Sequence, residues 1–269
     1  MKLQKYRILS LLTAVCLMGM LSGCSHAKEE DETENSGIYQ LSDLDGKRIG
    51  TQIGTTATIY AEDIPDAQLE SFTKGSAALR ALKENKIDAV IIDSEPAKAL
   101  TADTNDYRIL KETFVEEEYS IAYAKKNQEL GKKIDQALTK LKSDGTLEEI
   151  TSHWIGEEAD QVSYQPDESL TREGTLVMAT NAEFPPYESK TTNGEIIGID
   201  VDMMRAVCDE LNMNLEIKDM QFDSILTSVQ NGKTDVGVAG ISITEERQKS
   251  VAFTQSYAVT RLMVIVRNE

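Results

Sequence analysis

The chain has 269 residues, of which 28% are charged, and its formal net charge at pH 7 is −18. This acidity repels nucleic acid and anionic lipid headgroups, so we expect no nucleic-acid partner. The two histidines, His26 and His153, are too few for a histidine-ligated metal site and argue against a Ser-His triad. Because the sequence also has no Gly-rich phosphate loop, we expect no metal, no cofactor and no catalytic residue.

Residues 1–23 have the composition of a secretory signal peptide. Three basic residues stand before residue 8, an apolar run follows over residues 8–21, and small residues precede Cys24. The apolar run is too short to cross a bilayer comfortably. The segment LSGC, residues 21–24, resembles the lipobox of bacterial lipoproteins, which implies that Cys24 carries a lipid on the extracytoplasmic face of the cell membrane. The alternative is an ordinary signal peptide followed by a chance cysteine.

The segment after the signal is predicted to be a tether. Residues 24–37 are polar and acidic and offer little to bury, so we expect them to be disordered. Without the signal the net charge becomes about −21, because three basic and no acidic residues leave with it. About 230 residues remain, enough for one large or two small cores. Cys208 is the one cysteine among the residues that follow the predicted tether. Its position in an amphipathic run predicts a buried core cysteine.

Two segments of the chain follow the same plan. ALKENKIDAVIID, residues 81–93, aligns with SVQNGKTDVGVAG, residues 228–240. Each joins the end of an amphipathic helix to an apolar strand through a polar turn, and each has an earlier strand, at 47–51 and 175–180. This pattern predicts an α/β fold with two parallel sheets in two lobes rather than one long sheet. Chance similarity of short helix–strand pieces is the alternative.

Ligands of open α/β sheets bind beyond the carboxyl ends of the strands. Four segments of this sequence are predicted to lie there: residues 52–58, residue 93, residues 181–187 and residues 240–247. If the two lobes face each other, these segments line one cleft.

The residue types in those segments suit an α-amino acid. Arg247 has a rigid fork of donors that matches a carboxylate. Asp93 suits an ammonium group, Phe184 and Phe222 offer flat walls, and Gly240 allows close approach of the backbone. Each has a simpler explanation: Arg247 as a solvated charge, Asp93 as a helix cap, the phenylalanines as core. As a set at four strand ends, they favour a binding site.

Two parts of the chain resemble the bacterial extracellular solute-binding proteins of family 3. The part that resembles the family's first half, residues 174–268, contains NAEFPPYE (181–188), GIDVDMM (198–204), FDSIL (222–226) and GKTDVGVAGISITEER (232–247). The part that resembles its second half, residues 41–156, contains LSDLDGKRIGTQIGTT (41–56), ALKENKIDAVIID (81–93) and HWIG (153–156). The resemblance implies a two-lobed, type II periplasmic-binding-protein-like fold, with two Rossmann-like lobes joined by a two-strand hinge.

The order of the two halves is inverted relative to the family. A circular permutant, a fragment of a tandem protein and a domain-swapped dimer all explain this order. Each motif occurs once, so a permuted monomer needs no partner. In that interpretation lobe 2 comprises residues 38–118 and 262–269, lobe 1 comprises residues 119–261, and residues 157–173 form the permutation linker. Strands near 118–122 and 258–262 cross between the lobes as the hinge.

The resemblance also implies roles for individual residues. Arg247 binds the α-carboxylate with backbone N–H groups near Ser242 and Thr55–Thr56, and Asp93 with the Gly240 carbonyl binds the α-ammonium group. The remaining predicted contacts flank the ligand or face its side chain: Phe184, Phe222, Asn181, Glu183, Gln52 and Ile92. Several relatives have an aspartate where this chain has Asn181, so the sequence favours a polar over a strongly basic amino acid.

The same resemblance implies delivery of the amino acid to the permease subunits of an ABC importer, with no enzyme activity. Two alternatives stay open. The first is an enzyme on the same scaffold, similar to cyclohexadienyl dehydratases, in which Glu183 is the candidate proton donor. The second is a ligand sensor without transport.

Overall fold

The computed structural model describes residues 37–268. The predicted signal peptide, Cys24 and nearly all of the predicted tether lie outside the described residues. Among the described residues, no helix is both long and apolar enough to cross a membrane.

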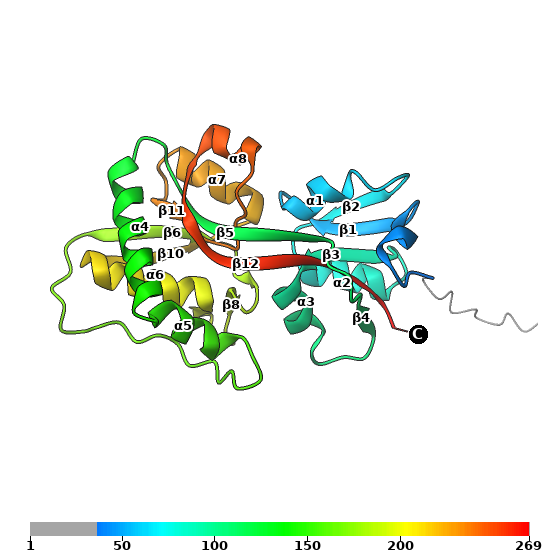
Figure 1. Ribbon diagram of the computed structural model, residues 1–269, viewed down its shortest axis with the longest axis horizontal. Helices are drawn as coiled ribbons and strands as arrows, with labels where there is room; N and C mark the ends of the chain where they lie inside the picture. The colour runs from blue at the N-terminus through cyan, green and yellow to red at the C-terminus, as the bar shows by residue number, and fades with distance from the viewer. Residues whose placement is uncertain (1–36, 269) are drawn as a thin grey trace, which may run out of the picture. The chain divides into compact units, whose positions relative to one another are not determined.

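Lobe 2 has a parallel sheet of three strands in the order β2-β1-β3 (Figure 1). Successive side chains of β3 point to opposite faces of the sheet and therefore pack into two different hydrophobic cores. Val90 and Ile92 belong to one core, and Ala89 and Ile91 belong to the other. The strands are β1 (Arg48–Gln52), β2 (Gln68–Phe72), β3 (Ala89–Asp93) and the short β4 (Tyr107–Ile109). The helices are η1 (Leu41–Leu44), α1 (Thr56–Ala61), α2 (Gly75–Lys83) and α3 (Ser94–Thr101).

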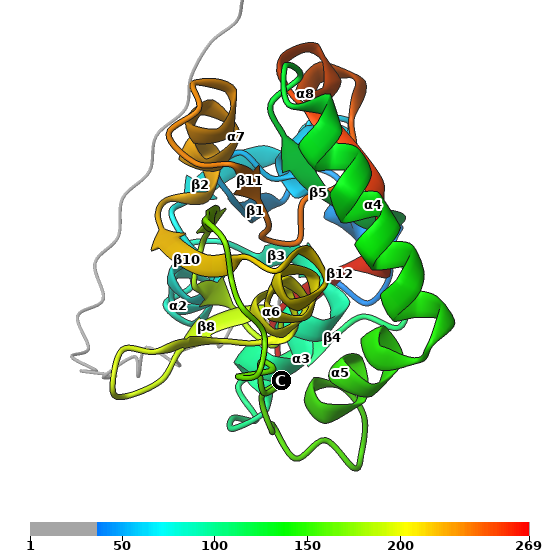
Figure 2. The same cartoon turned by 90° about the vertical axis from the view of Figure 1, so that its left-hand side faces the viewer.

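Lobe 1 repeats this plan with a parallel set in the order β10-β6-β11. Its strands are β6 (Thr175–Thr180), β10 (Asn214–Asp219) and β11 (Val236–Gly237), and β7 (Glu183–Phe184), β8 (Glu188–Lys190) and β9 (Ile196–Ile197) form a separate small sheet. Its helices are α4 (Gln128–Ser143), α5 (Thr146–Trp154), α6 (Ile199–Leu211), α7 (Phe222–Gln230) and α8 (Glu245–Ser250) (Figure 2). Cys208 on α6 is 1% exposed, which confirms the predicted core cysteine.

Two long antiparallel strands join the lobes. β5 (Val115–Tyr123) pairs with β12 (Ala252–Arg267) from Ala252 opposite Tyr123 to Leu262 opposite Val115. β5 also pairs with β11 of lobe 1, and β12 with β3 of lobe 2. Hydrogen bonding is therefore continuous through one nine-stranded sheet, and the prediction of two separate sheets was wrong in this respect. The reason is that the crossing strands use both of their edges.

The segment 157–173 contains no helix or strand and is largely exposed. A buried carboxylate of α6 nevertheless holds its middle part in place. Asp209 accepts hydrogen bonds from the Tyr164 hydroxyl (3.0 Å), the Asp167 N–H (2.8 Å) and the Arg172 guanidinium (2.5 Å). Burial and the hydrogen bond to Asp209 raise the pKa of Tyr164 to about 12.

Candidate functional site

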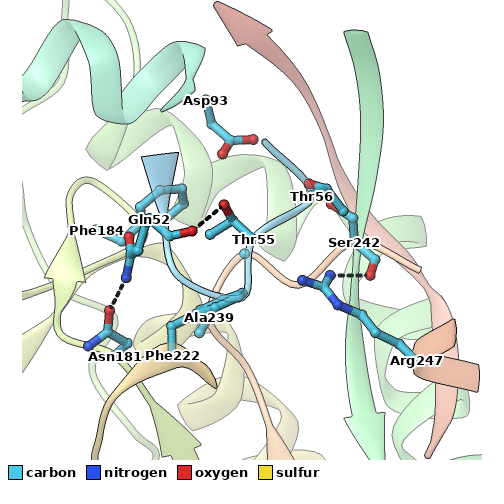
Figure 3. A pocket seen from close by; sticks show the side chains of 11 residues that line it. Gln52, Thr55, Thr56, Asp93, Asn181, Phe184, Phe222, Ala239, Ser242 and Arg247 are labelled. Carbon is cyan, nitrogen blue, oxygen red and sulfur yellow. Dashed lines mark hydrogen bonds between the residues drawn. The ribbon is translucent and has the colours of Figure 1, made fainter. Parts of the chain in front are cut away.

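A cavity of about 330 Å³ lies where the carboxyl ends of the strands of both lobes meet (Figure 3). Ten of the twelve predicted ligand contacts line the cavity: Gln52, Thr55, Thr56, Asp93, Asn181, Phe184, Phe222, Gly240, Ser242 and Arg247. Ala239 also lines it and was not predicted.

Arg247 defines one side of the cavity. It lies in the first turn of α8, whose N-cap Thr244 accepts a hydrogen bond from the Arg247 N–H (3.1 Å). Its guanidinium donates to the Ser242 carbonyl (2.6 Å) and, across the lobes, to the Gly54 carbonyl (2.9 Å). Burial lowers the pKa of Arg247, against the opposing effect of Glu117 and Asp93. A half-buried guanidinium whose hydrogen bonds go to carbonyl groups has the chemistry to bind a carboxylate in their place.

The Gly54 carbonyl is presented by a turn that requires glycine. Gly54 has φ +81°, and a Cβ atom there would lie 3.1 Å from the Cβ of Asp223 in lobe 1. The left-handed backbone and this close approach both favour the absence of a side chain.

Asp93 ends β3 and is the N-cap residue of α3, but its side chain does not cap that helix. Instead it points into the cavity and accepts a hydrogen bond from the Thr260 hydroxyl of β12 (3.2 Å). Burial raises the pKa of Asp93 to about 7; neighbouring Glu117 adds to the rise, and the hydroxyls of Tyr119 and Thr260 oppose it. A cationic group in the cavity would therefore convert Asp93 to its charged form.

Two amide side chains close the end of the cavity opposite Arg247 (Figure 3). The Gln52 Nε2 of lobe 2 donates to the Asn181 Oδ1 of lobe 1 at 2.9 Å, and the Asn181 Nδ2 donates to the Met220 carbonyl at 2.9 Å. Both side chains are buried, at 7% and 4% exposure. This end of the cavity is polar and uncharged.

Aromatic rings form the walls. Phe184 stacks on Tyr187 with ring centroids 5.9 Å apart, and the Phe222 ring lies 5.6 Å from the Arg247 guanidinium carbon. Gly240 closes the wall: its φ is +55°, and a Cβ atom there would lie 2.8 Å from the Phe184 ring. A larger residue at 240 would therefore move the ring or fill the cavity.

One buried residue of this region, Glu117, was missed by the sequence analysis. It lies on the crossing strand β5 and accepts hydrogen bonds from Thr56 of lobe 2 (2.7 Å) and Ser242 of lobe 1 (3.1 Å). Its acidic neighbours suggest a solvated surface. However, residues 117, 119 and 121 share one face of a strand, and the apolar Tyr119 and Ile121 identify that face as buried.

Glu183 was predicted to contact or face the ligand side chain. It does not line the cavity; it is exposed and forms an ion pair of 3.2 Å with Lys74 of lobe 2. Successive residues of a strand point to opposite faces, so an inward Phe184 turns Glu183 outward. Ile92, also expected near the ligand side chain, is instead a core residue. Glu183, the candidate proton donor of the dehydratase alternative, is thus not among the residues that line the cavity.

The mixed α/β fold and the arrangement of its lobes define a protein of the type II periplasmic-binding-protein class. The family model for the bacterial extracellular solute-binding proteins, family 3, matches residues 38–157 and 176–269. The chain belongs to this family.

Relatives match over a shorter region. The putative ABC transporter arginine-binding protein 2 of Escherichia coli K12 is 38% identical over 89 residues, which is 33% of this chain and 37% of that protein. The histidine-binding periplasmic protein of the same strain is 32% identical over 92 residues, 34% of this chain and 35% of that protein. The chain thus spans about a third of the length of these relatives, which are named as binding proteins rather than enzymes.

Among solved structures, an ancestral arginine-binding protein bound to arginine is 45% identical over 29% of this chain and 34% of that chain, with a TM-score of 0.28.

Proposed function

We propose that this protein is an extracytoplasmic binding protein that captures an amino acid between its lobes and delivers it to the permease subunits of an ABC importer. The observation that carries this proposal is the pairing of a carboxylate receptor, Arg247, with a buried anion, Asp93, in one small cavity. An α-amino acid has both complementary charges in fixed geometry. Relatives named for arginine and histidine binding support the same class of ligand.

In this proposal the ligand carboxylate takes the place of the Ser242 and Gly54 carbonyls on Arg247. The ammonium group pairs with Asp93 and the Gly240 carbonyl, while Phe184 and Phe222 flank the ligand. Thr55, Thr56 and Ser242 complete the carboxylate end, and Gln52 and Asn181 face the ligand side chain.

We favour a ligand with a neutral polar side chain. Of the described residues that line the cavity, Asp93 and Arg247 are the two charged ones, and the α-amino and α-carboxyl groups engage both. A guanidinium at the Gln52–Asn181 end would be a buried charge without a counter-ion, which is costly. Glutamine is therefore expected to bind more tightly than arginine.

The test is a screen of the twenty amino acids against residues 25–269, first by thermal shift and then by calorimetry. A ligand that binds the native state raises the melting temperature with its concentration. No response to any amino acid would refute the proposal, and arginine binding more tightly than every neutral amino acid would refute the preference for a neutral side chain.

Two variants localise the site. Arg247→Ala and Asp93→Ala should each abolish measurable binding while circular dichroism stays unchanged. Asp103→Asn removes an exposed charge just beyond α3 and is the matched control, which should bind as the wild type does. Retained affinity in either alanine variant would move the site elsewhere.

We also propose that the chain is a circularly permuted monomer with the lobe boundaries given above. The family match is interrupted over residues 158–175, which supports a linker there, and both family blocks contribute to one cavity within one chain. Light scattering coupled to size exclusion tests this directly. A compact monomer is expected, and a dimer that persists on dilution would indicate domain swapping.

The lipid anchor on Cys24 is likewise a proposal, supported by the LSGC segment at residues 21–24. Expression in a bacterial host with radiolabelled palmitate should label the wild-type chain and leave Cys24→Ser unlabelled. Equal labelling of both would refute an anchor at this residue.

A further inference from the structure

Two carboxyl groups are buried behind the wall of the cavity. Glu188, in β8, and Asp200, in the first turn of α6, are both 0% exposed. They belong to the motifs NAEFPPYE and GIDVDMM, and neither lines the cavity. Two ionised carboxylates in contact inside a protein repel each other strongly, so this pair requires an explanation.

The oxygen atoms of the pair have few partners. Among residues 37–268, neither oxygen of Glu188 has a hydrogen-bond partner of normal geometry, and nor does Oδ1 of Asp200. The Asp200 N–H donates to the Tyr187 carbonyl at 3.0 Å, which places the start of α6 beside Glu188, and the two carboxyl groups influence each other electrostatically. A single proton held between them satisfies both groups and removes one of the two buried charges.

The remaining Asp200 oxygen reaches the binding cavity through the backbone. Its Oδ2 accepts a hydrogen bond from the Gly240 N–H at 3.0 Å. Gly240 lines the cavity in the left-handed conformation, with φ +55°. A charged acceptor makes a stronger hydrogen bond than a neutral one, so an ionised Asp200 fixes this peptide firmly.

We propose that Glu188 and Asp200 share one proton, held on Glu188, and that the resulting monoanion positions the Gly240 peptide for the ligand ammonium group. Asp200 is thus a positioning residue that acts through Gly240 without touching the ligand. This second step rests on the proposed amino-acid binding; the shared proton does not.

The electrostatic surroundings support this distribution of charge. Burial and the neighbouring carboxylates of Asp200, Asp219 and Asp93 raise the pKa of Glu188 well above its usual range. Burial raises the pKa of Asp200 only to about 6, because Tyr257, the Gly240 N–H and Glu188 oppose the rise. The start of α6 adds the positive end of a helix dipole, which favours an anion at Asp200.

The first experiment measures the proton without any ligand. Infrared spectra of the wild type at pH 7 should contain the C=O band of a protonated carboxylic acid. Glu188→Gln should remove this band, and the exposed control Glu216→Gln should leave it unchanged. In an ¹⁵N-resolved spectrum the Gly240 amide should titrate near pH 6 in the wild type. Absence of a Glu188-dependent band would overturn the shared proton.

The second experiment measures affinity for the amino acid found in the screen. Glu188→Gln keeps an uncharged hydrogen-bond donor to Asp200, so its Kd should stay within about threefold of wild type. Glu188→Ala and Asp200→Asn should each weaken binding by about tenfold or more. Rescue by glutamine distinguishes positioning from simple loss of packing.

Unchanged affinity in Asp200→Asn would overturn the positioning role. If Asp200→Asn does not fold, the test is the Gly240 amide resonance of the wild type. A resonance that does not shift around pH 6 would overturn the positioning role of Asp200. If the wild type binds no amino acid, the proposed function and the positioning role fail together, while the infrared result stands independently.

Discussion

The unusual protonation of Asp93 predicts a strong dependence of ligand affinity on pH. The pKa of this buried carboxyl is raised to about 7 in the ligand-free protein. Ammonium binding requires the carboxylate, so the fraction of ionised Asp93 sets the fraction of competent protein. At pH 6 this fraction is about one in eleven and at pH 8 about ten in eleven, so Kd should be about tenfold weaker at pH 6.

Calorimetry in two buffers of different ionisation enthalpy measures the linked proton. Binding at pH 7 should release about half a proton for each ligand bound, because half of the chains must ionise Asp93. Asp93→Asn lacks the carboxylate, so neither binding nor proton release should be detectable at either pH. Equal affinity at both pH values, with no proton release, would refute the assignment of Asp93 to the ammonium group.

The same group affects stability in a defined direction. The folded pKa of Asp93 lies above its unfolded value of 3.8, so the folded chain holds this proton more tightly. Its contribution therefore destabilises the ligand-free fold progressively as pH rises from about 4 to about 7, by up to about 4 kcal/mol. The ligand ammonium offsets this cost, so a saturating ligand should raise the melting temperature more at pH 8 than at pH 6.

Three further predictions concern single residues. Arg247→Lys keeps the charge but loses the planar fork, so calorimetry should show at least about tenfold weaker binding; wild-type affinity would exclude a two-point contact. Glu183→Gln removes only the exposed ion pair with Lys74, worth about 0–1 kcal/mol, so Kd should change by less than about fivefold; a larger loss would place Glu183 back at the ligand. Asp209→Ala frees segment 157–173, so limited proteolysis there should accelerate by about tenfold or more, and unchanged cleavage would show that Asp209 does not hold it.

The residues that line the cavity could be predicted because strand ends are a property of local sequence. The apolar runs at 89–92 and 175–180 identify strands, and the polar residues that follow them reach the same edge of a parallel sheet. That rule led to Asp93 and Asn181. It says nothing of side-chain direction within a two-residue strand, so it could not show that Phe184 lines the cavity while Glu183 does not.

Contacts between the lobes could not be predicted in the same way. The hydrogen bond between Gln52 and Asn181 joins residues 129 positions apart, and no periodicity encodes it. The continuous sheet was also missed, because apolar patterning identifies β5 and β12 as strands without saying that both of their edges are paired. Long-range register is a consequence of packing the complete chain.

The geometry of the site depends on the crossing strands and little on which ends of the chain are joined. The guanidinium of Arg108, in β4, donates to the Ile38 carbonyl at 2.6 Å, and β4 pairs with β12 at Val266, so the start and the end of the described chain lie close together. A chain that runs from Gly174 to Asn268, continues through a short Gly/Ser linker to Ile38 and stops at Gly156 should therefore fold to the same cavity.

This rearranged chain should bind the amino acid within about threefold of wild type. Its free energy of unfolding should fall by about 3–5 kcal/mol, because this chain lacks Tyr164, Asp167 and Arg172, the partners of the buried Asp209 carboxylate. Calorimetry and urea unfolding measure both quantities. A folded, monomeric rearranged chain that does not bind would show that segment 157–173 shapes the site; since that segment contacts α6 through Asp209 and contributes no residue to the cavity lining, we expect binding to survive.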